Sequence, residues 1–65
     1  MKNINQTYYL FSDLEEMTNT LTKLNIPYEV IDSDDFLAIG TVIAEVTDEQ
    51  WVEIIETIKK DYYGY

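Results

Sequence analysis

The sequence FLAIGTVIAEV, Phe36–Val46, contains the longest apolar run of the chain. Apolar residues occupy both alternating positions of this run, so a strand formed from it would need cover on both faces. The pattern therefore predicts the central strand of a sheet. Gly40 lies inside the run, where a glycine usually marks a bulge or a bend.

A helix is predicted directly after this strand. Thr47 and Gln50 are spaced as a capping box, which is a sequence signal for a helix start. The residues spaced to form a buried stripe on this helix are Trp51, Ile55, Ile58 and Tyr62, with Val52 and Ile54 beside them. The acidic residues predicted on its opposite side are Glu49, Glu53 and Glu56.

Two strands and one helix are predicted before the central strand. The aromatic stretch Gln6–Phe11 favours a strand, and Ser12 with Glu15 predicts a capping box that starts a helix. The apolar stripe expected on that helix consists of Leu14, Met17, Leu21 and Leu24. Asn25 suits the left-handed residue that ends a helix. Ile26–Ile31 then forms an edge strand, because Pro27 cannot donate a ladder hydrogen bond.

This order of elements, βαββα, predicts a single α+β domain over residues 1–65. Placing the most apolar strand in the middle gives the sheet order 1-3-2, with both helices on one face. The topology resembles a ferredoxin-like fold that lacks its last strand. Residues 61–65 are expected to form a tail or a short extra strand. The uncovered sheet face is expected to carry apolar residues, so a homodimer through that face or through the edge of the first strand is a further expectation.

The composition excludes several classes of function. The 65 residues include no cysteine and no histidine, so disulfides, thiolate metal sites and imidazole acid–base chemistry are absent. We therefore expect a protein that is not an enzyme and that binds no metal and no cofactor. Thirteen acidic residues against four lysines give a net charge of −9, which disfavours direct contact with nucleic acid or an anionic membrane. Without disulfides or a recognisable signal peptide, we expect a cytoplasmic location in a bacterial cell.

The acidic stretch Asp32–Asp35 fails as a calcium loop. An EF-hand loop that began at Asp32 would place Phe36, Leu37 and Ile43 at positions where an oxygen ligand, glycine and glutamate are required. As a turn the stretch needs no metal, because serine and aspartate side chains hydrogen-bond their own backbone.

The predicted fold nevertheless gathers acidic residues at one end, because the start of the first helix and the loop before the central strand lie together there. The acidic residues expected at this end are Asp13, Glu15, Glu16, Asp32, Asp34 and Asp35, with Asp61 nearby. To match the charge density of DNA, nearly all thirteen acidic residues would have to lie on about a third of the surface.

Charge leads to two hypotheses of function. In the first, the chain is an acidic protein-binding module, an inhibitor that mimics nucleic acid and blocks a basic surface of a larger protein. In size and charge it resembles the small acidic anti-defence inhibitors that phages encode. In the second, the chain is a homodimerising structural or regulatory module and its charge serves only solubility. The candidate partner-binding residues are Asp13, Glu15, Glu16, Asp32, Asp34, Asp35, Glu49, Glu53, Glu56, Tyr62, Tyr63 and Tyr65.

Overall fold

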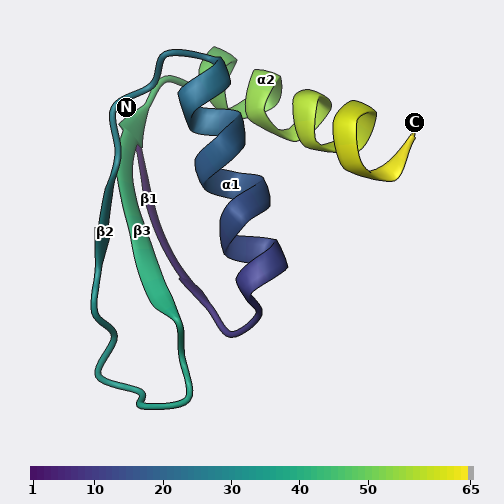
Figure 1. Cartoon of the computed structure of the whole chain (residues 1–65). Coiled ribbons are helices and arrows are strands. Elements are labelled where there is room, and N and C mark those ends of the chain that lie inside the picture. Colours follow the sequence, from purple (N-terminus) through teal and green to yellow (C-terminus); the bar gives the residue numbers. More distant parts are fainter. Residues whose placement is uncertain (65) are drawn as a thin grey trace.

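The fold is a three-stranded antiparallel sheet with two helices on one face. In the computed structural model, which describes residues 1–64, β3 (Gly40–Val46) lies between β1 (Lys2–Tyr8) and β2 (Glu29–Ile31). Both neighbours are antiparallel to β3. The predicted α+β class and the predicted order 1-3-2 are therefore confirmed, and Figure 1 shows β3 between the other two strands.

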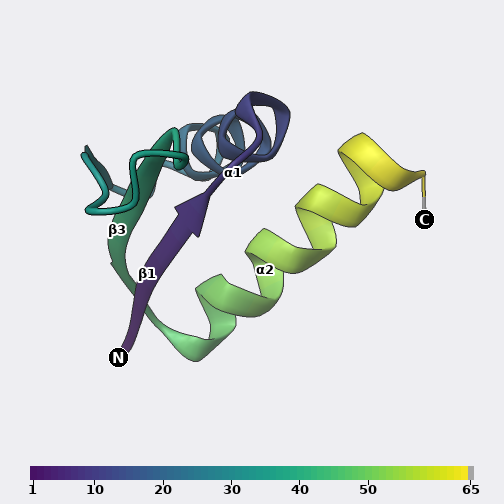
Figure 2. The same ribbon diagram turned by 90° about the horizontal axis from the view of Figure 1, so that it is seen from below.

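Two helices complete the βαββα order. Helix α1 (Phe11–Lys23) connects β1 to β2, and α2 (Asp48–Ile58) follows β3 directly. A π-helical turn, η1 (Lys59–Tyr63), continues α2 towards the C-terminus. Figure 2 shows α2 running obliquely past α1 and away from the strands. Within residues 1–64, neither helix has both the length and the apolar composition that crossing a membrane requires.

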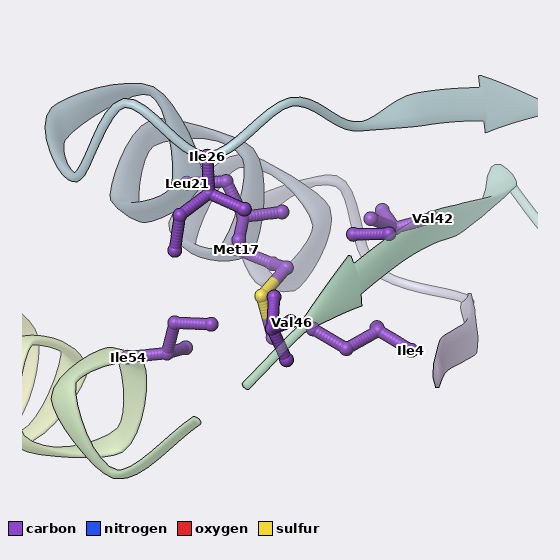
Figure 3. Close-up of a cluster of buried hydrophobic side chains, with 8 residues drawn as sticks. Ile4, Met17, Leu21, Ile26, Val42, Val46 and Ile54 are labelled. Atoms are coloured by element: carbon purple, nitrogen blue, oxygen red, sulfur yellow. The ribbon is translucent and has the colours of Figure 1, made fainter. Parts of the chain in front are cut away.

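The core lies between one face of the sheet and the two helices. The register pairs Ile4 with Ala44, and paired residues of antiparallel strands point to the same face. The buried residues of that face are Ile4, Val42, Ala44 and Val46. They form one cluster with Met17 and Leu21 of α1, with Ile54 of α2 and with Ile26, which precedes β2 (Figure 3). Both helices therefore cover the same face, as the sequence predicts.

The opposite sheet face is mainly polar, which corrects the expectation of an exposed apolar face. Asn3, Asn5 and Thr7 of β1 lie on it, and the hydroxyl oxygens of Thr7 and Thr41 are 2.9 Å apart. The expectation was wrong because β1 begins at Lys2 rather than at Gln6, so the aromatic stretch after Tyr8 is not part of the sheet. This face no longer gives a reason to expect a dimer.

The start of β3 and the length of β2 also differ from the prediction. Pairing along β1 stops where Tyr8 faces Gly40, so residues 36–39 have no strand partner and form a loop. The second strand is shorter than predicted, with three residues instead of six. Gly40 is a position of close approach: a Cβ there would lie 3.1 Å from the Cγ1 of Val30.

The two helices begin in different ways. The predicted capping box of α2 is confirmed, since the Gln50 amide donates to the Thr47 hydroxyl at 3.1 Å and the Thr47 amide donates to the Gln50 side chain at 2.8 Å. The box predicted for α1 does not form. Helix α1 starts at Phe11 after Leu10, so Ser12 already lies inside the first turn and makes no cap.

The apolar stripe of α1 matches the prediction, and that of α2 matches it in part, since Trp51 and Ile58 pack against the core. Met17 and Leu21 are buried, and Asn25 ends the helix with φ of 58°. On α2 the fully buried residue is Ile54, which the spacing placed beside the stripe, and Tyr62 is exposed. Helix α2 therefore contributes Trp51, Ile54 and Ile58 to the core, whereas Tyr62 lies beyond its last turn, in η1.

Within residues 61–64, helical structure stands where a tail or a short extra strand was expected. Residues 59–63 form η1, and Gly64 ends it in the left-handed region with φ of 74°. Tyr65 lies outside the described residues.

Candidate functional site

The turn between β1 and α1 (residues 9–10) and the loop between β2 and β3 (residues 32–39) lie at the same end of the molecule, at the bottom of Figure 1. Two hydrogen bonds connect this loop to the last residue of β1 and to the turn. The amide of Ile39 donates to the carbonyl of Tyr8 at 2.8 Å, and the hydroxyl of Tyr9 donates to Asp35 Oδ2 at 3.1 Å. We call these two segments, together with the start of α1 (residues 11–16), the open end.

Large apolar side chains are exposed at the open end. Phe36 is 92% exposed, Leu37 69%, Phe11 66% and Leu10 61%. We call these four residues the tip. Single exposed apolar residues are common on protein surfaces, but several at one end typically mark an interaction site.

The loop that carries Phe36 is held in place by its own side chains. The amide of Asp35 donates to the Ser33 hydroxyl at 3.2 Å, and the amide of Leu37 donates to Asp35 Oδ1 at 3.0 Å. The amide of Ala38 also donates to the carbonyl of Asp35 at 3.0 Å. The predicted turn role of Ser and Asp is confirmed. Because its neighbours fix the backbone on both sides, Phe36 is presented to solvent by a defined loop.

Carboxylates at the open end act on nearby tyrosines. The hydroxyl of Tyr63 donates to Glu16 Oε2 at 3.2 Å, and this bond raises the pKa of Tyr63. Burial, and then the charges of Asp13 and Glu16, raise the pKa of Tyr8. The hydrogen bond to Asp35 raises the pKa of Tyr9. Nearby carboxylate charges add to all three pKa shifts, although burial is the leading cause for Tyr8 and a hydrogen bond for Tyr9 and Tyr63.

Few cations oppose these carboxylate charges. Within residues 1–64 the single ion pair joins Lys23 Nζ to Asp61 Oδ2 at 2.8 Å, near the C-terminal end of α1. In the described part of the chain, the carboxylates of the open end therefore have no lysine partner. A shallow hollow of about 240 Å³ lies beside them, and Glu15 and Glu16 contribute to its wall together with Tyr62.

The structure brings together only some of the candidate residues. Asp13, Glu15, Glu16 and the loop aspartates share the open end, whereas Asp61 is paired with Lys23. Glu49 lies in the first turn of α2, which begins at the opposite end of the sheet (Figure 1). Glu53 and Glu56 follow along α2. The candidate acidic residues are thus divided between the open end and α2.

The candidate tyrosines lie in or after η1. The hydroxyl of Tyr62 accepts a long hydrogen bond of 3.5 Å from the side-chain amide of Asn19, and Tyr63 contacts Glu16 as described. The predicted site residue Tyr65 lies outside the described residues. No group of three or more acidic side chains in residues 1–64 is arranged to hold a metal ion.

Sequence reasoning missed the four tip residues. Each was assigned to a strand, because aromatic and branched apolar residues favour strands. For Phe36 and Leu37 a usable signal was present in Ser33 and Asp35. Their side chains can accept hydrogen bonds from backbone amides up to residue 37, so the turn can extend past Asp35.

Comparisons with protein-family models, with curated proteins and with solved structures give no match for this chain.

Proposed function

We propose that this chain is an acidic protein-binding module that occupies a basic, nucleic-acid-binding surface of a larger protein and blocks it. The observation that carries the proposal is the tip: four exposed apolar side chains next to carboxylates that no lysine of the described residues neutralises.

This combination has the chemistry of a protein interface. Interfaces typically have an apolar centre that excludes water and a polar rim. Here Phe36 and Leu37 supply the apolar anchor, and Asp13, Asp32 and Asp34 supply acidic groups at the same end. Unpaired carboxylates accelerate association with a basic partner and disfavour acidic ones. The hollow beside Glu15 and Glu16 offers a place for one lysine or arginine side chain.

A basic surface that binds phosphates is the natural target for such an end. Arginine and lysine that contact phosphates also pair with carboxylates. Because the candidate acidic residues are divided between the open end and α2, we propose that the open end blocks a local part of the nucleic-acid site rather than imitating a length of duplex. A nucleic-acid-handling defence protein in the cytoplasm of a bacterium, opposed by a phage or mobile-element inhibitor, fits this chemistry.

The test is affinity capture with the chain as bait in bacterial lysate. The wild-type bait should retain a nucleic-acid-binding protein that is released by added DNA or RNA and by rising salt. The triple variant Asp32→Asn, Asp34→Asn, Asp35→Asn and the double variant Phe36→Ser, Leu37→Ser should each lose most of this protein.

A matched control distinguishes the effect of the open end from the effect of the overall net charge. The variant Glu49→Gln, Glu53→Gln, Glu56→Gln removes the same number of charges from α2 and should retain the partner. An equal loss of the captured partner in both triple variants would mean that binding depends on the overall charge rather than on the open end. Capture that survives both DNA competition and tip replacement would overturn the proposal. Recovery of the chain alone, as salt-insensitive dimers, would favour a homodimerising structural module.

A further inference from the structure

The outer edge of β1 has no strand partner within residues 1–64, because β1 pairs with β3 on its other side only. We infer that this edge binds the same edge of a second copy, antiparallel and around a twofold axis, so that two sheets join into one. This surface is separate from the tip, and the inference does not depend on the proposed function.

The β1 edge lacks the features that usually prevent strand pairing. Natural edge strands are protected by proline, by charged side chains or by bulges that interrupt the register. The register of β1 with β3 is continuous from Lys2 to Tyr8, and residues 3–7 (NINQT) contain neither a charge nor a proline. Apart from Lys2 at its start, this seven-residue strand is unprotected, and it is long enough to accept another strand.

A hollow of about 390 Å³ lies along this edge. Five consecutive residues of β1, residues 2–6, line it. Successive residues of a strand point to opposite faces, so a hollow that touches all five follows the strand edge rather than one face. Met17 and Trp51 form its helical side, and Figure 2 shows β1 beside the space between the two helices. An added strand would enter this hollow.

The distribution of charge favours a second copy as the occupant. Lys2 is the only charged side chain in the first twelve residues, and all thirteen acidic residues follow them. Two copies of a chain with net charge −9 can therefore meet along β1 without opposing strand carboxylates. A closed twofold contact also uses the same surface twice and leaves neither edge exposed.

If the two β1 strands of the dimer overlap over their full length, an attraction between opposite charges is added. This overlap places the twofold axis at Asn5, so that Lys2 of one copy faces Tyr8 of the other on the helix-covered side. Tyr8 lies next to the start of α1, where the charges of Asp13 and Glu16 act on it. Lys2 of each copy would thus approach Asp13 of the other, and the contact occurs twice.

A charge swap tests this geometry. The association constant of the wild type, Lys2→Glu and Asp13→Lys would be measured by sedimentation equilibrium, each alone and the two variants mixed in equal amounts. Each variant alone opposes like charges twice, so its dimer dissociation constant should rise about tenfold. In the mixed dimer, the introduced glutamate faces the introduced lysine at one contact, and the native Lys2 and Asp13 face each other at the other. The mixture should therefore regain a dissociation constant close to that of the wild type.

The outcomes are decisive. A wild type that stays monomeric up to millimolar concentration overturns the inference. Dimers that ignore both substitutions, or a mixture that fails to regain affinity, place any dimer on another surface. Far-UV circular dichroism checks that each variant is folded. Should either variant fail to fold, the wild type itself provides the test: backbone amides in residues 3–7 must exchange more slowly as concentration rises, and uniform exchange at all concentrations would refute the contact.

Discussion

The two ends of the molecule use apolar residues in opposite ways. At the end where β3 runs into α2, Leu21, Val46 and Ile54 are fully buried; we call this the closed end. At the open end, Phe36 and Leu37 are largely solvent-exposed although they belong to the same apolar run of sequence as the core of β3. The helices cover one end of the sheet and leave the loops of the other end uncovered (Figure 1). Apolar character therefore predicts burial only where a second layer covers the strand.

The largest effect is expected at the closed end, from Ile54→Ala. Removing this fully buried side chain should lower the free energy of unfolding by about 2–5 kcal/mol, since it leaves a cavity against α1 and β3. Urea denaturation followed by circular dichroism measures the loss. Val52→Ala on the exposed side of the same helix is the matched control and should change stability by less than about 0.5 kcal/mol. Similar losses in both variants would remove the distinction between buried and exposed positions of α2.

The two helix starts provide the next comparison. Thr47→Ala deletes a capping hydroxyl that α2 uses and should cost about 1 kcal/mol. Ser12→Ala deletes a hydroxyl that caps nothing and should cost less than about 0.5 kcal/mol. Thermal unfolding of both variants under the same conditions gives the difference. A larger loss for Ser12→Ala would mean that α1 starts at the predicted capping box after all.

Alkaline pH should weaken the open end through Tyr8. Burial and the charges of Asp13 and Glu16 raise the pKa of Tyr8 in the folded state above its ordinary value. The folded state therefore holds this proton more tightly, so the contribution to stability is complete below about pH 10 and is lost as the pH rises through the folded pKa. Urea midpoints measured from pH 8 to 11 should fall more for the wild type than for Tyr8→Phe. Parallel curves for the two proteins would exclude this contribution.

The smallest effect on stability is expected at the tip. Phe36→Ser should change the free energy of unfolding by less than about 0.5 kcal/mol, because the side chain is 92% exposed. The same substitution should reduce capture of the proposed partner strongly, as expected for an interface anchor. Chemical denaturation and affinity capture on one preparation measure both quantities. A destabilisation of several kcal/mol would show that Phe36 belongs to the fold rather than to a binding surface.

Sequence patterns predicted the architecture well where local and tertiary preferences agree. The βαββα order, the central place of β3 and the stripe of Met17 and Leu21 on α1 all follow from periodicity. The Thr47 box and the left-handed Asn25 follow from local hydrogen bonding and backbone sterics.

The strand ends could not be predicted, because pairing depends on the partner strand. Lys2–Asn5 carries one apolar residue and gives little strand signal, yet it pairs with the end of β3. Tyr9 and Phe11 favour strands, but no strand remains opposite them once Gly40 is reached. The topology predicted the acidic residues of the open end. The exposed apolar residues of the tip were not predicted, because the predicted strands extended over them.

The register of β1 also has a consequence for the order of events during translation. Lys2 pairs with Val46 and Tyr8 with Gly40, so β1 obtains its complete strand partner only once synthesis has reached Val46. Closing such a long loop costs entropy before any ladder bond forms, and sheets with distant pairings fold slowly for this reason. Helix α1, in contrast, can form from local contacts alone. Strand β1 is thus synthesised before α1 but can complete its pairing only after α1 has been made.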